Sequence, residues 1–194
     1  MLSTSIVALS SLFIGAQAVS LDTRNASTCF TTHTGYLRGD GPGTDFGRNN
    51  ANEVIYPSNG TDIELSLQAC EGVTSYGSFD YPTSRLVSTD LDVNFTIRCL
   101  TVVPSAANAS ILNVELAVCG DDTVPPANQT FYYENHDFGN QLLFAGQANC
   151  TDLSGTIDDD TGKPLTANGT SLWQLRCISD GGASTFGLSG AWDN

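Results

Sequence analysis

The chain has few basic residues and no long apolar run. Its 194 residues include seven Lys and Arg against 21 Asp and Glu, which gives a net charge of −14. Phosphate binding requires clustered Lys and Arg, so the composition argues against nucleic acid or an anionic membrane surface as a partner. No stretch of the chain approaches the roughly 20 consecutive apolar residues of a membrane-spanning helix. The acidity is explained by solubility alone.

Recognisable catalytic motifs are also missing. The chain has two histidines, His33 and His136, and neither accompanies a nucleophile motif such as Gly-x-Ser-x-Gly. A glycosidase needs two carboxylates at a suitable separation, but no pair of the 21 acids is distinguished by its spacing. We therefore expect a protein that is not an enzyme and needs no cofactor.

Metal-binding patterns are equally weak. No Cys-x-x-Cys pair is present, which argues against zinc. Three successive aspartates at 158–160 differ from the alternating carboxylates of a calcium loop, and an acidic turn explains them better. Glu134, His136 and Asp137 form a small cluster without a fourth ligand, which is typical of a solvated linker. We expect no metal site.

The first 18 residues resemble a secretory signal peptide. A short apolar run over 6–16 is followed by Ala-Gln-Ala at 16–18, the small-x-small form of a cleavage site. A buried N-terminal strand or helix is the alternative. With cleavage there, residues 19–194 form one mature domain of 176 residues. The expected location is secreted and extracellular.

Cysteines and glycosylation sequons agree with export. Six cysteines in a short chain suit an oxidising compartment, where they can form three bridges. Seven Asn-x-Ser/Thr sequons predict a glycoprotein. Their asparagines are Asn25, Asn59, Asn94, Asn108, Asn128, Asn149 and Asn168.

Apolar residues alternate with polar ones in several segments. The alternating apolar sets are Ile63, Leu65, Leu67; Phe95, Ile97, Cys99; and Leu112, Val114, Leu116, Val118. A period of two predicts strands with one buried face. No window shows a helical stripe, and 19 glycines and seven prolines punctuate the segments. The chain is predicted to be all-β.

A unit of about 50 residues repeats three times along the chain. The units are placed at about 20–82, 83–138 and 139–194, each with an opening cysteine, a second cysteine and a following aromatic strand. Of fifteen possible connectivities, the repeat selects Cys29–Cys70, Cys99–Cys119 and Cys150–Cys177. Free reactive cysteine is the alternative. Phe79, Phe131 and Phe186 are predicted as three equivalent core residues.

The second unit resembles the ricin B-type lectin family. It reads Cys-Leu-Thr-Val at 99–102, Val-Glu-Leu-Ala-Val-Cys at 114–119 and Gln-Thr-Phe at 129–131, close to that family's Cys-Leu-Asp-Val, Val-x-Leu-x-x-Cys and Gln-x-Trp. The first and third units share the cysteine and aromatic positions. The resemblance implies a β-trefoil with three pseudo-repeats and, with the pairing above, three intra-repeat disulfides.

The resemblance also implies sugar binding in shallow pockets, up to one in each repeat. The family's acidic residue falls on Thr31, Thr101 and Asp152, so the third repeat is the expected site. A carboxylate there would accept hydrogen bonds from sugar hydroxyls, and an aromatic face would stack on the pyranose. Trp173 and Gln174 are the nearby candidates for stacking and for the amide contact. Alternatively, Asp152 is a surface carboxylate and Trp173, between two leucines, packs in the core.

The expected function is non-catalytic binding of a carbohydrate or glycoconjugate. Two alternatives remain open. One is a secreted trefoil glycoprotein that has lost sugar binding and acts at a cell surface or as an effector. The other is a trefoil protease inhibitor that uses the 39–52 loop, with Arg38 and Arg48 as anchors. The sugar and the oligomeric state are left open.

Overall fold

A computed structural model describes residues 29–39, 45–70, 83–90, 96–104, 111–121, 124–136, 139–145, 154–155, 163–177 and 186–189. These residues contain strands and one short 3₁₀ helix, η1 (Ala127–Gln129), and no α-helix. The all-β prediction is confirmed. The strands are β1 (Cys29–Gly39), β2 (Gly47–Arg48), β3 (Val54–Ile55), β4 (Glu64–Cys70), β5 (Thr83–Ser88), β6 (Arg98–Pro104), β7 (Ile111–Val118), β8 (Phe131–His136), β9 (Gly139–Phe144), β10 (Ser154–Gly155), β11 (Gln174–Cys177) and β12 (Phe186–Leu188).

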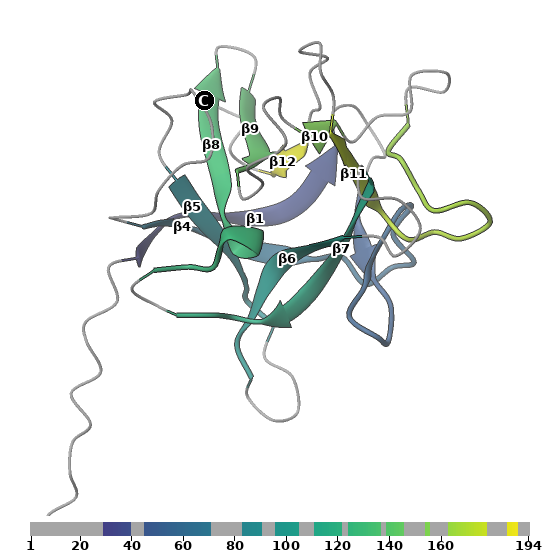
Figure 1. Ribbon diagram of the computed structural model, residues 1–194, viewed down its shortest axis with the longest axis horizontal. Coiled ribbons are helices and arrows are strands. Elements are labelled where there is room, and N and C mark those ends of the chain that lie inside the picture. The colour runs from purple at the N-terminus through teal and green to yellow at the C-terminus, as the bar shows by residue number, and fades with distance from the viewer. Residues whose placement is uncertain are drawn as a thin grey trace, which may run out of the picture.

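Six of these strands follow one another around a curled sheet. Antiparallel pairs join β12 to β1, β1 to β4, β4 to β5, β5 to β8 and β8 to β9. Strand β9 lies against β12, so the sheet curls back on its other end (Figure 1). We call β1, β4, β5, β8, β9 and β12 the ring strands.

The remaining strands form three hairpins, each between two ring strands in the sequence. They are β2–β3, β6–β7 and β10–β11. Strand β7 pairs with β11, and isolated bridges join Ile55 to Leu172 and Glu53 to Glu115. The hairpins therefore contact one another directly.

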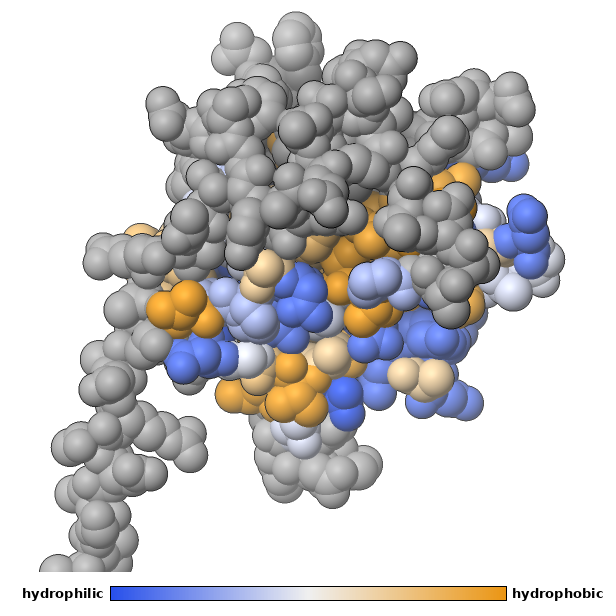
Figure 2. Space-filling view, in the orientation of Figure 1, coloured by the Kyte–Doolittle hydropathy of each residue, from blue (hydrophilic) through white to orange (hydrophobic). Residues whose placement is uncertain are grey.

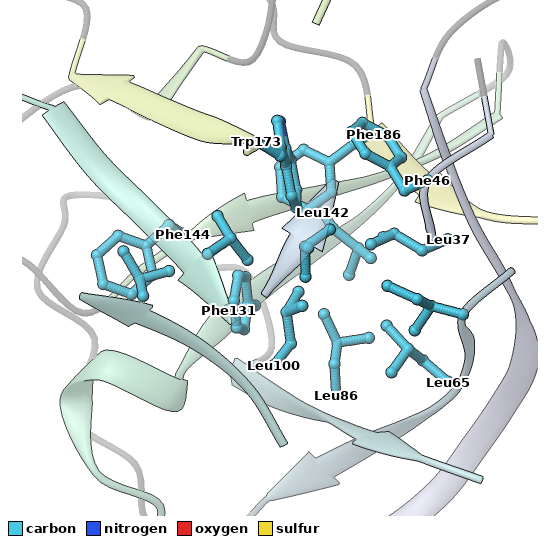
Figure 3. Packing of buried hydrophobic residues seen from close by; sticks show 14 of the residues in the cluster. Leu37, Phe46, Leu65, Leu86, Leu100, Phe131, Leu142, Phe144, Trp173 and Phe186 are labelled. Atoms are coloured by element: carbon cyan, nitrogen blue, oxygen red, sulfur yellow. The ribbon is translucent and has the colours of Figure 1, made fainter. Parts of the chain in front are cut away.

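Each ring strand contributes a side chain to one core. Leu37, Leu65, Leu86, Phe131, Leu142 and Phe186 come from β1, β4, β5, β8, β9 and β12 in turn, and all are at most 1 % exposed. Figure 3 shows these side chains converging from different strands. Full burial of a side chain of this size contributes about 1.5–3 kcal/mol. The core is thus built by the whole ring rather than by one part of the chain.

The predicted core aromatics are confirmed at Phe131 and Phe186, while Phe79 lies outside the described residues. In chain order the strands fall into three groups of four, β1–β4, β5–β8 and β9–β12. Phe131 and Phe186 begin β8 and β12, the last strands of the second and third groups. The corresponding ring strand of the first group is β4, whose buried side chains include Leu65. Leu65 therefore contributes to the core from the strand that corresponds to β8 and β12.

The period-two predictions are largely confirmed. Ile63, Leu65 and Leu67 are buried, as are Leu112, Val114 and Leu116. The prediction is wrong at Val118 and Ile97, which are 61 % and 54 % exposed. Val118 is the last residue of β7, and Ile97 precedes the start of β6, so both lie at the open end of the hairpin. Burial of alternate residues ends where the neighbouring layer ends.

Two of the three predicted disulfides are confirmed. Cys29 bonds Cys70 with an S–S distance of 2.13 Å, and Cys99 bonds Cys119 at 2.06 Å. The predicted Cys150–Cys177 bridge lies outside the described residues, which do not include Cys150.

The two confirmed bridges lie at different places in their groups. Cys29 and Cys70 are partners across the ring strands β1 and β4. Cys99 is on β6 and Cys119 follows β7, so this bridge closes a hairpin. The expected equivalence of Cys29 with Cys99 therefore does not hold, although the pairing itself does.

Candidate functional site

The structure places Trp173 inside the core. The side chain is fully buried, with ring centroids 4.4 Å from Phe46 and 5.0 Å from Phe186. Its indole Nε1 is buried and has no hydrogen-bond partner. Trp173 thus takes the alternative role, packing in the core, and it presents no open face for stacking on a sugar.

Of the other two predicted contacts, only Gln174 falls within the described residues. The Gln174 side chain is 8 % exposed, and its Nε2 donates to Asn113 Oδ1 at 2.7 Å. Because Gln174 and Asn113 are partners across β11 and β7, this bond braces two hairpins. Asp152, the carboxylate expected to hold a sugar, lies outside the described residues.

The acid position of the second unit is occupied by a buried structural residue. Thr101 is 2 % exposed, and its hydroxyl donates to the Cys99 carbonyl at 2.9 Å. Thr31, the matching position of the first unit, is exposed on β1. Neither residue supplies the carboxylate that the lectin resemblance calls for.

Gln129 connects this second unit internally. The side chain is 4 % exposed; its Nε2 donates to Thr101 Oγ1 at 2.9 Å and to the Val118 carbonyl at 3.0 Å. Its Oε1 accepts from the Gly120 N–H at 2.9 Å. One amide therefore satisfies polar groups of β6, of β7 and of the segment after Cys119. The Gln-Thr-Phe motif is structural here.

No group of three or more His, Cys, Asp or Glu that could hold a metal occurs among the described residues. His33 is half-buried, and its Nε2 lies 3.1 Å from the Ser189 carbonyl oxygen. Asp137 and the 158–160 aspartates lie outside the described residues, as do the side chains of Glu134 and His136. On β8, burial raises the pKa of the Tyr133 hydroxyl above its ordinary value.

The two proposed protease anchors are held in ion pairs. Arg38 Nε lies 2.9 Å from Asp45 Oδ1, and an Arg48 guanidinium nitrogen lies 3.3 Å from Asp90 Oδ2. An anchor that enters a protease pocket must leave its carboxylate partner, which lowers the gain on binding. The described part of the 39–52 loop thus offers no unengaged arginine.

A wide open groove lies where the β2–β3 hairpin meets the chain before β11. Its volume is about 710 Å³, and it is lined by Tyr56, Pro57 and residues 163–171. Backbone bonds hold the two sides together: the Tyr56 N–H donates to the Ser171 carbonyl at 2.8 Å, and the Trp173 N–H donates to the Val54 carbonyl at 2.8 Å. We refer to it as the Tyr56 groove.

The Tyr56 groove combines one aromatic ring with many polar groups. Tyr56 is half-buried, and its ring centroid is 5.7 Å from that of Phe46, so the core supports it. The other lining residues include Lys163, Thr166, Asn168, Thr170 and Ser171. The sequence gives no signal for Tyr56, because Tyr56 is distant in sequence from residues 163–171 and lies at no repeat position.

Three sequon asparagines fall within the described residues. Asn59, Asn128 and Asn168 are all exposed. The other four lie outside the described part. Exposure of the asparagine is what a glycan requires of a folded protein.

Exposed apolar side chains are spread over several elements. The large ones among the described residues are Phe30, Tyr36, Ile97, Val118 and Val124. Figure 2 shows hydrophobic residues scattered between hydrophilic ones on one face. Single exposed apolar side chains are usual on soluble surfaces and define no site.

Comparison with protein-family models and with curated proteins finds no match for this chain. No helix in the described residues is long and apolar enough to cross a membrane.

Proposed function

We propose that this protein is a secreted, N-glycosylated β-trefoil related to the ricin B-type lectins, and that it binds carbohydrate without catalysis. The observation that carries the proposal is the Tyr56 groove, an open depression with a core-supported aromatic ring among polar groups. The partner is a carbohydrate or glycoconjugate, and no cofactor takes part.

The strand order supports the trefoil. The twelve strands of the described residues comprise six ring strands and three hairpins, with one hairpin in each group of four. The groups span 29–70, 83–136 and 139–188, which fit within the proposed repeats of 20–82, 83–138 and 139–194. The core positions repeat as well: Leu37, Leu86 and Leu142 come from the first strand of each group.

The chemistry of the groove supports a neutral sugar as ligand. A pyranose has an apolar face that stacks on an aromatic ring and hydroxyls that exchange hydrogen bonds with amides and alcohols. The Tyr56 groove has a ring of this kind, with the hydroxyl-bearing Thr166 and Ser171 in its lining. Its volume of about 710 Å³ falls within the range of small-ligand sites, roughly 300–1,000 Å³. The net charge of −14 disfavours strongly acidic glycans.

Disulfides and sequons support secretion and glycosylation. Both described bridges require an oxidising compartment to form and persist. The three described sequon asparagines are all exposed. Each of these features is expected of an exported glycoprotein.

A glycan array tests the function. We expect the oxidised, deglycosylated protein to bind a subset of neutral oligosaccharides, and Tyr56→Ala to lower the affinity about fivefold, since stacking on an aromatic ring is worth about 1 kcal/mol. Phe30→Ala removes an exposed aromatic outside the groove and is the matched control. Asp152→Ala separates the Tyr56 groove from the pocket implied by the family. No retention on any glycan, or retention unaffected by Tyr56→Ala, refutes the proposed site.

One observation favours the alternative of a trefoil that has lost sugar binding. Trp173, Gln174 and Thr101 are buried and used in packing or internal hydrogen bonds. An array on which the protein binds no glycan supports this alternative. Titration against extracellular proteases tests the alternative of a protease inhibitor. Neither a sugar-binding trefoil nor one that has lost sugar binding would slow a protease.

A further inference from the structure

We infer that the first sugars of an N-glycan on Asn168 lie in the Tyr56 groove against the Tyr56 ring, so that this glycan regulates access of external sugars to the groove. The inference rests on the glycosylation and the binding site proposed above. The ligand that occupies the groove in the glycosylated protein is then the N-acetylglucosamine core of the protein's own glycan.

Asn168 stands on a well-braced turn at the edge of the groove. The Thr170 N–H donates to the Ala167 carbonyl at 2.9 Å, and the Ala167 N–H donates to the Leu172 carbonyl at 2.9 Å. Gly169 has a φ of 74°, a left-handed conformation that glycine adopts without steric cost. A sugar on Asn168 therefore starts from a fixed point.

The sequon threonine strengthens the same turn. Its hydroxyl donates to the Ala167 carbonyl at 3.0 Å and accepts from the Leu172 N–H at 3.2 Å. Thr170 thus fixes both the residue before Asn168 and the strand-like segment that leads to Trp173. These bonds fix the backbone of the turn that carries Asn168.

The groove begins next to this turn. Asn168, Thr170 and Ser171 line it together with Tyr56, and the Tyr56 N–H donates to the Ser171 carbonyl at 2.8 Å. Tyr56 is therefore held across from a residue only three positions after Asn168. A glycan attached here has an aromatic ring and a polar depression within reach, and its apolar sugar face can cover the ring.

Tethering gives this glycan an advantage over free sugars. A ligand attached by a short linker has an effective concentration on the order of millimolar at the adjacent site. An external oligosaccharide of millimolar affinity must compete with the tethered glycan for the groove, and the apparent affinity of the external sugar is lowered. The other described sequon asparagines, Asn59 and Asn128, are exposed but do not line the groove.

The covalent step is ordinary N-glycosylation. The Asn168 side-chain nitrogen forms a bond to C1 of the donor sugar, the bond from C1 to the lipid pyrophosphate breaks, and the amide loses one proton. The donor is a lipid-linked oligosaccharide pyrophosphate of the secretory pathway. The transfer precedes folding, so the groove forms around a glycan that is already present.

The experiment uses the full chain produced in a glycosylating host. Peptide mass spectrometry should find Asn168 occupied, and nuclear Overhauser contacts should join the first N-acetylglucosamine to the Tyr56 ring protons. Removing the sequon by Asn168→Gln should raise the affinity for an array-selected external oligosaccharide at least about twofold, the factor expected when a sugar of millimolar affinity competes at millimolar effective concentration. Asn128→Gln, the matched control, removes a glycan elsewhere and should leave the affinity unchanged.

Three results overturn the inference: an unoccupied Asn168, no contact between the sugar and the Tyr56 ring, or equal affinity of the wild-type and Asn168→Gln proteins for a bound oligosaccharide. Failure of the proposed lectin function gives a different pattern. If no external glycan binds even Asn168→Gln, but the contacts to Tyr56 persist, the lectin proposal falls and the glycan placement stands.

Discussion

The β6–β7 hairpin and the β2–β3 hairpin differ in how their polar groups are used. Strands β6 and β7 have seven and eight residues and are closed by the Cys99–Cys119 bridge. The buried Gln129 amide satisfies Thr101, Val118 and Gly120 on that side. Strands β2 and β3 have two residues each, and β3 leads directly into Tyr56 and the open groove.

The contrast separates a structural hairpin from a candidate binding hairpin. Where side chains satisfy one another internally, no donor or acceptor is left for a ligand. Around Tyr56, backbone bonds to residues 163–173 hold the framework, and the hydroxyl-bearing Thr166 and Ser171 line the groove. In the unit that resembles the lectin family most clearly, the motif residues are thus engaged in internal hydrogen bonds and packing.

Removing Trp173 should have the largest effect, because this residue packs where the two regions meet. Trp173→Ala is expected to lower the free energy of unfolding by about 3–5 kcal/mol, since it leaves a large cavity beside Phe46 and Phe186. Urea denaturation measures this loss. Phe30→Ala, at a 59 % exposed aromatic, should cost under about 0.5 kcal/mol. Equal losses in the two variants would show that Trp173 is not a core residue.

Removing the hairpin disulfide should affect stability and leave the groove intact. The double variant Cys99→Ala and Cys119→Ala opens a loop with a sequence separation of 20 and is expected to cost about 3 kcal/mol on the chain-entropy model. Carbohydrate binding at the Tyr56 groove should stay within about twofold of wild type. A large loss of binding in a variant that is still folded would mean that the two hairpins are coupled.

Replacing Gln129 tests the structural reading of the Gln-Thr-Phe motif. Gln129→Leu should cost about 1–3 kcal/mol, because it leaves the buried Thr101 hydroxyl and the Val118 carbonyl without their amide donor. Denaturation of unglycosylated protein gives the value. The neighbouring Asn128→Ala is the control, since Asn128 is exposed and should cost little. A neutral Gln129→Leu would argue that water replaces the amide.

The smallest effect is expected at Arg48 on the β2–β3 hairpin. Arg48→Gln breaks the pair with Asp90, whose side chain is 50 % exposed, and should cost under about 1 kcal/mol. The difference from wild type should shrink further at high salt, because screening weakens exposed pairs. A loss above about 2 kcal/mol would show that the ion pair organises the short hairpin.

Local patterns in the sequence were reliable where one strand carries the information. Alternation at Ile63, Leu65 and Leu67 predicted a strand with one buried face, and the two described disulfides follow the predicted pairing. The same patterns failed at Ile97 and Val118, because burial depends on whether a neighbouring layer covers the strand end. Local alternation carries no information about that layer.

The correspondence of positions between the three repeat units was predicted less well. The sequence aligned Cys29 with Cys99, although one lies on a ring strand and the other on a hairpin strand. The paired cysteines are 41 residues apart for Cys29–Cys70 and 20 residues apart for Cys99–Cys119, and both separations allow a bridge within one unit. Spacing constrains which residues can approach each other, and it does not state which strands they occupy.

The sequence by itself determined the all-β class, the buried faces of the main strands and two disulfide pairs, because these follow from residue periodicity and cysteine position. Only the tertiary structure brought Tyr56 to residues 163–171 and buried Trp173 between Phe46 and Phe186. The physical reason is that a surface depression forms between segments distant in the chain. Its shape depends on which hairpins pack together, a long-range choice that no local pattern records.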